Sequence, residues 1–219
     1  MHLGRTAKSV IHQKIKHMRT LSIILGFVVL LSPFVKSQDL KTFNAEAGNE
    51  TDYEDLMVSL NGGCNLGCAI GWTLSTTSTL NPQGENSYEA KNMDDGNKNT
   101  AWIEGKSDYG IGEKIIITFA DATGHSGIPF DGIELTNGYA KSQTTWSDNS
   151  RIKLLKLYHN KKPMFLIKLV DSIYPQWISW GRDFIVSNGD IVELEIIEVY
   201  EGDKWKDTGI SDLSLNGAH

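Results

Sequence analysis

The sequence contains few of the side chains that enzymes most often use for acid-base catalysis. Of its six histidines, three fall within the first 17 residues and one is the last residue. The other two, His125 and His159, lie in turn-like segments, where a solvated imidazole is the simpler interpretation. The nucleophile elbow, the zinc-protease helix motif, the Walker loop and the dinucleotide-binding glycine loop are all missing. We therefore expect no catalysis, although a carboxylate pair of glycoside hydrolase type stays open because acidic chains offer many candidates.

Cysteine is equally scarce. The two cysteines, Cys64 and Cys68, lie in the segment GGCNLGCAIGW. A zinc site would need further ligands, and a redox C-x-x-C motif has one residue fewer between its cysteines. In an exported chain, such a local pair predicts a disulfide that closes a tight loop. A loop this short removes little chain entropy, so the bond would fix local shape rather than global stability.

Long apolar runs are limited to residues 21–31, which follow several basic residues and precede a small-residue segment ending at Ser37. This arrangement predicts a signal peptide over residues 1–37 and a secreted or periplasmic protein. The run is too short to span a bilayer comfortably, since a spanning helix needs about 20 apolar residues. A retained signal anchor is the alternative, and Met18 offers a second start with a shorter signal.

Basic residues are few beyond the signal segment. Residues 38–219 carry 15 Lys and Arg against 27 Asp and Glu, a net charge of −12. Nucleic acids and anionic membranes require basic patches, so the charge argues against both as partners, whereas neutral sugars and cations remain compatible. The length suits one domain with a full core, which we expect to be a monomer. We assign residues 38–61 to a polar, mobile leader and residues 62–219 to a binding domain.

No segment keeps an apolar stripe at helical spacing over three turns, and no internal repeat occurs. Short β-type segments recur instead, with turn-forming residues between them. They cover residues 56–60, the run after Trp72, and residues 114–119, 132–137, 151–159, 163–170, 183–187 and 190–200. This pattern predicts an all-β fold, an antiparallel sandwich.

A loop rich in side-chain oxygens precedes Trp102. It contains Asp94, Asp95, Asn97, Asn99 and Thr100, while Gly96 allows the positive φ that a tight loop needs. Oxygens gathered in this way suit a hard cation such as Ca²⁺. An Asx-rich turn without an ion is the alternative, because the same composition is ordinary in turns.

Aromatic residues beside turns point to a ligand site, since exposed rings can stack on sugars. We expect Trp102 in the core and place the site mainly in the segment 137–151, with acceptors from the hairpin around Tyr109. The candidate ligand-binding residues are Glu104, Tyr109, Glu113, Asn137, Tyr139, Lys141, Trp146, Asn149 and Arg151. The alternative is a structural network in which Arg151 pairs with Glu104 or Glu113.

Four segments, in order, carry a family resemblance: DGNKNTAWIEG, YGIGEKIIITF, TNGYAKSQTTWSDNSRIKLLKLYHN and EVYEGDKWKDTGISDLSLNG. Residues 62–217 closely resemble the discoidin-like NAD-glycohydrolase translocation F5/8 type C domain. The resemblance implies a galactose-binding-like jelly roll that binds glycans or other surface ligands without catalysis. The family takes its name from toxins in which this module accompanies a separate NAD-cleaving domain, and nothing in this sequence resembles that domain.

The resemblance also implies a structural calcium site. It would use the carbonyl of Asp94, the side chain of Asp95, the Asn97 region and Thr100, with Asp212 closing the site where the family usually has glutamate. We therefore expect an exported glycan- or cell-surface-binding module with a structural Ca²⁺. A protein-interaction, adhesion or toxin-translocation module is the alternative, and a glycoside hydrolase is a third.

Overall fold

Strands dominate the computed structural model, which describes residues 39–49, 66–120 and 124–217. The predicted signal peptide, the expected strand at residues 56–60 and Cys64 lie outside the described residues. The signal and the Cys64–Cys68 disulfide therefore stay predictions. Within the described part of the chain, no helix has both the length and the apolar character that a membrane crossing requires.

Twelve strands and three short helical segments make up the described domain. The strands are β1 (Thr42–Asn44), β2 (Glu46–Ala47), β3 (Trp72–Thr76), β4 (Trp102–Ile103), β5 (Lys114–Phe119), β6 (Ile128–Asn137), β7 (Ser150–His159), β8 (Lys162–Lys168), β9 (Gln176–Ser179), β10 (Ile185–Val186), β11 (Ile191–Tyr200) and β12 (Thr208–Gly217). The helical segments are η1 (Leu66–Cys68), η2 (Ala90–Met93) and α2 (Gln143–Asp148).

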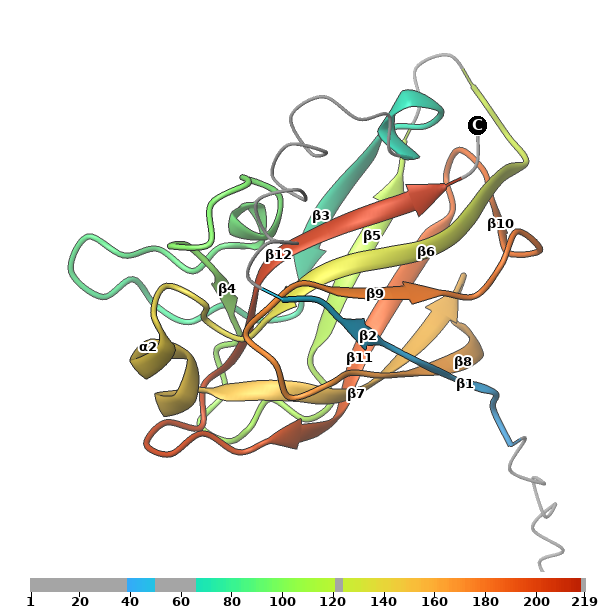
Figure 1. Ribbon diagram of the computed structural model, residues 1–219. Helices are drawn as coiled ribbons and strands as arrows, with labels where there is room; N and C mark the ends of the chain where they lie inside the picture. Colours follow the sequence, from blue (N-terminus) through green and yellow to red (C-terminus); the bar gives the residue numbers. More distant parts are fainter. Residues whose placement is uncertain (1–38, 50–65, 121–123, 218–219) are drawn as a thin grey trace, which may run out of the picture. The chain divides into compact units, whose positions relative to one another are not determined.

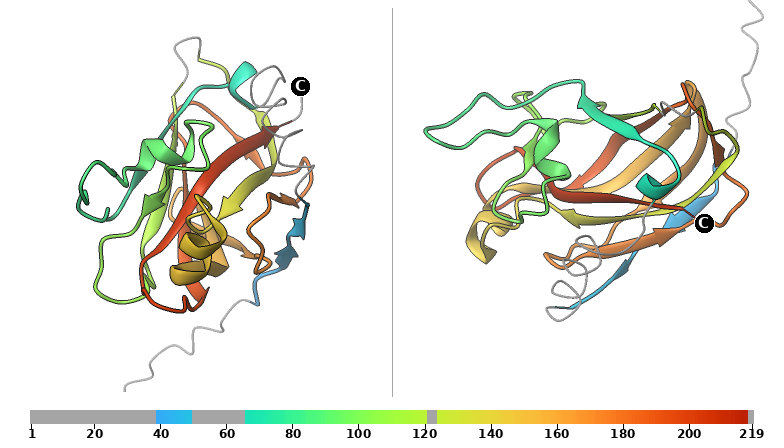
Figure 2. Two further views of the ribbon diagram at one scale, coloured as in Figure 1. Left: turned by 60° about the vertical axis from the view of Figure 1, so that its left-hand side comes forward. Right: turned by 90° about the horizontal axis from the view of Figure 1, so that it is seen from above.

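The hydrogen-bonded strands run in the order β2-β9-β6-β12-β7-β11-β5-β3. Outside this order, β8 pairs with β7 and β1 pairs with β8, while β4 pairs with β12 and β10 with β6. This sheet folds over into two layers, with β9, β6 and β12 in one and β7, β11 and β5 in the other (Figures 1 and 2). A short parallel pairing of Thr208 and Gly209 with Ser150 and Arg151 links the layers. Nearly all other pairs are antiparallel, which confirms the predicted β-sandwich.

Alternation of side chains places the core between the layers. In β5, Ile115, Ile117 and Phe119 are buried while their neighbours are half-exposed. β11 pairs with β5 in register and buries every second side chain over the same stretch. Trp102 is fully buried, and its Nε1 donates a 3.0 Å hydrogen bond to the carbonyl of Ser78. The expectation that Trp102 belongs to the core is confirmed.

The segment assigned to a mobile leader contributes to the sandwich instead. β1 pairs in parallel with β8, and β2 pairs with β9 in the opposite layer. Main-chain hydrogen bonds from Leu166 to Lys41 and from Ala45 to Lys168 fix this crossing. For residues 42–47 the expectation of a mobile leader is therefore wrong. The polar composition of the segment suggested a leader, but edge strands need only main-chain pairing and few buried side chains.

The longer connections gather at one end of the sandwich. α2, the loop that contains η2 and β4, and the loop between β11 and β12 all lie on the left of Figure 1. At the Tyr109–Glu113 turn, Gly110 and Gly112 have φ of +68° and +89° and the amide of Glu113 donates to the Gly110 carbonyl. This agrees with the glycine hairpin that the sequence predicts. The candidate site lies among these loops.

Candidate functional site

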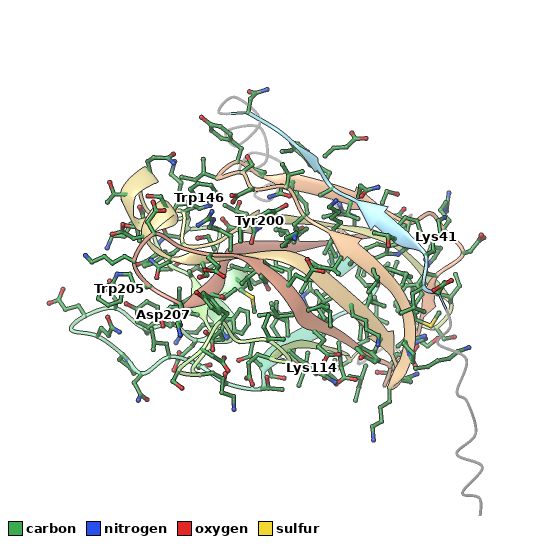
Figure 3. The ribbon with its side chains drawn as sticks, turned by 90° about the horizontal axis from the view of Figure 1, so that it is seen from below. Lys41, Lys114, Trp146, Tyr200, Trp205 and Asp207 are labelled. Carbon is green, nitrogen blue, oxygen red and sulfur yellow. The ribbon has the colours of Figure 1, made fainter. Side chains whose placement is uncertain are left out.

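A pocket of about 280 Å³ lies at the loop end of the sandwich. Figure 3 shows Trp205 and Asp207 at this end, on the same side as Trp146. Loop residues before β4, the start of the segment after β6, the end of α2 and the β11–β12 loop all contribute to its wall. The lining residues are Leu80, Gln83, Tyr88, Ile103, Tyr139, Thr145, Asn149, Trp205 and Asp207.

The β11–β12 loop is held firmly against α2 by its own main chain. The amides of Lys204 and Trp205 both donate to the carbonyl of Asp148, at 3.1 and 2.7 Å. The amide of Ser150 donates to the carbonyl of Asp207, and the Ser150 hydroxyl donates to that of Trp205. α2 itself begins at Ser142, whose hydroxyl accepts from the amide of Thr145. Trp205 is therefore placed on a fixed loop although its side chain is 51% exposed.

Two tyrosines form the deeper wall of the pocket. The rings of Tyr88 and Tyr139 meet edge to face, with centroids 6.2 Å apart and planes at 89°. Both side chains are more than 90% buried and pack with Ala101, Ile103 and Leu80. Perpendicular rings of this kind present both a ring face and a ring edge to a ligand.

Asp207 is the acidic group of the pocket. Burial raises the pKa of its carboxyl above the ordinary value of 3.8. Its negative charge adds to burial in raising the pKa of Tyr88. Among the residues that the structure describes, no side chain forms a hydrogen bond or ion pair with this carboxylate. The described lining also contains no Lys, Arg or His.

Of the nine ligand-binding residues expected from the sequence, Tyr139 and Asn149 line this pocket. The amide of Asn149 donates to the carbonyl of Thr145, which fixes its side chain at the end of α2. Lys141 is exposed next to α2 but is not among the lining residues.

Asn137, Trp146 and Arg151 instead build a buried network behind the pocket. Asn137 bonds the main chain of Ile152 through both side-chain atoms, and Trp146 Nε1 donates to the carbonyl of Asn137. The Arg151 guanidinium lies 4.5 Å from the Trp146 ring centroid. Its Nε and Nη2 each donate to Asp171 at 2.9 Å. Arg151 therefore belongs to a structural network, as in the alternative considered from the sequence, but its partner is Asp171 and not Glu104 or Glu113.

The three residues from the Tyr109 hairpin lie outside the pocket lining as well. Glu104 is fully buried and accepts from the amides of Lys106 and Thr208, and burial raises its pKa to about 7. Glu113 is buried and accepts from the Thr77 hydroxyl at 2.7 Å. The Tyr109 hydroxyl donates to Glu201. All three side chains tie loops to the sandwich.

Sequence reasoning missed seven of the lining residues: Leu80, Gln83, Tyr88, Ile103, Thr145, Trp205 and Asp207. Trp205 and Asp207 were visible as a loop aromatic and an acid two residues apart. Their proximity to Tyr88 was not visible, because more than a hundred residues separate them in the sequence.

The oxygen-rich loop folds around its own side chains. Asp95 accepts from the amide of Asn97 at 3.0 Å and from the hydroxyl of Thr100 at 2.8 Å. The Asn97 carboxamide oxygen accepts from the amide of Asn99, and Gly96 has a φ of +63°. The positive φ at Gly96 agrees with the sequence. These contacts are also those of a plain Asx turn.

Asp212 on β12 faces this loop from the sandwich. The residue is 4% exposed, and burial together with the charges of Asp95 and Asp94 raises the pKa of its carboxyl to about 7. Within the described residues, Asp212 Oδ2 has no hydrogen-bond partner, and the same holds for Glu134 Oε1 and Thr136 Oγ1 on the neighbouring strand β6. An unpartnered buried carboxylate near two more carboxylates is costly unless it is protonated or a cation is bound.

The oxygen atoms of this loop and of Asp212 are of the kind that bind calcium. Oxygen ligands are what Ca²⁺ requires, and Asp94, Asp95, Asn97, Thr100 and Asp212 offer carboxylate, carbonyl and hydroxyl oxygens. The described residues contain no group of three His, Cys, Asp or Glu side chains arranged to hold a metal ion. A calcium ion here would therefore depend partly on main-chain carbonyls.

Residues 68–216 match the family model of the NAD glycohydrolase translocation F5/8 type C domain. No curated protein matches the chain. Two solved structures of the mycobacterial arabinofuranosyltransferase AftD, one of them a mutant, share 13% and 15% identity, with TM-scores of 0.48 and 0.46. The matches cover 68% and 67% of this chain but only 11% and 10% of AftD.

A two-domain protein of unknown function from Bacteroides fragilis is also similar, with 11% identity and a TM-score of 0.43. That match covers 66% of this chain and 41% of the Bacteroides protein. The chain thus spans well under two thirds of each of these structures. Similarities this low give no basis for transferring a ligand or an activity.

Proposed function

The chain belongs to the NAD glycohydrolase translocation F5/8 type C family, and on that premise we propose that it is an exported, non-catalytic module that binds carbohydrate in the pocket lined by Tyr88, Tyr139 and Trp205. Membership of a translocation and binding family favours a module without catalysis. The absence of catalytic motifs from the sequence favours the same conclusion.

The exposed ring of Trp205 is the observation that supports carbohydrate as the ligand. Its side chain is half exposed at the mouth of a pocket, on a loop fixed by main-chain hydrogen bonds. A rigid aromatic plane loses little conformational entropy when a sugar ring stacks on it. Gln83, Thr145 and Asn149 add polar groups that can orient hydroxyls.

The test is glycan binding by the full chain and by Trp205→Ala, measured on an array and by isothermal titration. We expect Trp205→Ala to lose at least about tenfold in affinity, with a nearly unchanged melting temperature because the ring is exposed. Ile111→Ala is the matched control, since Ile111 is equally exposed in a different loop. Equal binding by wild type and Trp205→Ala would contradict the proposal.

A structural calcium ion is the second part of the proposal. Asp212 Oδ2, buried and without a partner among the described residues, supports it. Asp95 and Thr100 would hold the ion from the loop and Asp212 from β12. The bound ion would neutralise the carboxylates and fix the loop, and it would take no part in chemistry.

The family description names translocation, so a protein partner is the second candidate for the same module. A protein partner captured through Trp205, without glycan binding, would favour that alternative.

A further inference from the structure

The carboxylate of Asp207 has no counter-charge in the pocket. The side chain is half-buried. Its negative charge contributes to raising the pKa of both Tyr88 and Glu104. The described lining residues include no basic side chain, and no hydrogen bond to this carboxylate occurs within the described residues. A partly desolvated carboxylate without a counter-charge binds a cationic donor more strongly than a neutral one.

The aromatic residues around Asp207 favour the same kind of ligand. The faces of Tyr and Trp rings attract ammonium groups, and cages of two or three rings are used for that purpose. Tyr88 and Tyr139 stand perpendicular to each other, and Trp205 lines the mouth.

Ammonium groups of the chain itself lie over rings in this region. Lys204 Nζ lies 5.1 Å from the Trp205 ring centroid, and Lys206 Nζ lies 5.3 Å from that of Tyr109. Lys204 is exposed and also lies 4.0 Å from Asp148, so it can leave Trp205 when a ligand binds.

Building on the carbohydrate proposal, we propose that this pocket selects a glycan that carries a free, protonated amino group. The ammonium group lies beside the Asp207 carboxylate and against the rings of Tyr88 and Tyr139, while the sugar ring stacks on Trp205. Gln83, Thr145 and Asn149 in the pocket lining can form hydrogen bonds with the sugar hydroxyls, which a simple alkylammonium ligand lacks. The volume of about 280 Å³ suits one sugar unit rather than a longer segment.

Two oligosaccharides that differ only in the amino group test this inference. The full chain is titrated calorimetrically with a glucosamine hexamer and with the N-acetylglucosamine hexamer, at about pH 6.5 where an amine is largely protonated. We expect the glucosamine hexamer to bind about tenfold more tightly or better. We also expect this preference to weaken with added salt.

Three variants assign the effect to residues. Asp207→Asn should reduce the preference for the amine to about twofold or less, and Trp205→Ala should weaken binding of both hexamers. Asp203→Asn removes one charge from an exposed position in the same loop and should leave the preference intact.

Equal or tighter binding of the acetylated hexamer, or an amine preference that survives Asp207→Asn, would overturn the inference. If neutral glycans bind in a Trp205-dependent manner while the glucosamine hexamer shows no advantage, the carbohydrate proposal stands and only the selection for an amine is wrong. If neither hexamer nor any glycan on the array binds, both proposals fail.

Discussion

The hydroxyl of Tyr139 donates a 3.2 Å hydrogen bond to the main-chain carbonyl of Asn99. Tyr139 forms a wall of the pocket, and Asn99 belongs to the oxygen-rich loop. The proposed ligand pocket is therefore hydrogen-bonded to the loop that carries most of the proposed calcium ligands. An ion that fixes the loop would also fix the Tyr139 ring, and this lowers the ordering cost of ligand binding.

This contact predicts that the two sites are coupled. Calcium should raise the glycan affinity of the wild type, and Tyr139→Phe should reduce that effect because it keeps the ring but removes the hydroxyl. The variant should lose about 1 kcal/mol of stability. The measurement is isothermal titration of a bound glycan with calcium and with a chelator. Tyr109→Phe, which removes a 2.9 Å bond to Glu201, is the control. An unchanged calcium effect in Tyr139→Phe would contradict the coupling.

Asp212→Asn should change stability in opposite directions with and without calcium. In chelator at neutral pH the variant should be more stable by about 1 to 2 kcal/mol, because it removes a buried carboxylate near Asp94 and Asp95. Its amide can also donate to the hydroxyl of Thr136 on the paired strand. With calcium the wild type should gain stability by mass action and the variant should not. Differential scanning fluorimetry would measure both melting temperatures. If neither calcium nor a chelator changes the melting temperature of the wild type, the loop is an Asx turn without a bound ion and the calcium proposal is wrong.

Stability should fall as pH rises from about 4.5 to about 7 in the presence of a chelator. Burial raises the pKa of Glu104 and Glu134 from 4.5 to about 7. In this window the folded state holds protons that the unfolded state has released, so raising the pH favours unfolding. Carboxyls with a lowered pKa, such as Glu113 and Asp190, have the opposite effect in more acidic solution.

Urea unfolding between about pH 4 and pH 8 would measure this dependence. Glu104→Gln should make the fall shallower without removing it, because the amide does not titrate while Glu134 and Asp212 still do. Glu85→Gln changes an exposed acid instead and should leave the profile as it is. A free energy of unfolding that rises steadily up to pH 8 would contradict the prediction.

Arg151→Ala should cost about 2 to 4 kcal/mol of stability. The guanidinium makes two bonds to Asp171, donates to the carbonyls of Asn149 and Glu201, and stacks on Trp146. Removing it leaves the buried carbonyl of Asn149 without this donor, while the part-exposed Asp171 limits the loss. Lys141→Ala, at an exposed position, should stay within about 0.5 kcal/mol of wild type. Chemical denaturation compares the two, and equal stabilities would show that the network contributes little.

The strands that the sequence predicted are those rich in β-branched and other apolar residues between turn-forming segments. β5 was predicted at its exact bounds, because three consecutive isoleucines and a threonine favour a strand, although Ile116 is half-exposed. β12 was missed. It is buried over Thr208–Leu215 yet carries Ser211, Asp212 and Ser214, so its sequence resembles a polar loop. Buried polar side chains on a central strand cannot be recognised without knowing which neighbours surround them.

The site was predicted only where its residues are close together in the sequence. Tyr139 and Asn149, both from the segment between β6 and β7, are the two expected residues that line the pocket, and their role in ligand binding stays a prediction. Trp146 and Arg151 come from the same segment, but they are buried and point to each other. Composition alone does not distinguish an aromatic and an arginine that stack on each other from a pair that face a ligand.

The chain enters the domain at β1 and then crosses from one layer to the other at β2. Lys41, just before β1, stands at the opposite end of the domain from Trp205 and Asp207 (Figure 3). Because β1 and β2 pair with different layers, a pull on the chain ahead of β1 would act first on the pairing of β1 with β8 and only then on that of β2 with β9. A surface or a fused protein that holds the chain at that end would therefore leave the pocket oriented outward, toward the surroundings from which a ligand arrives.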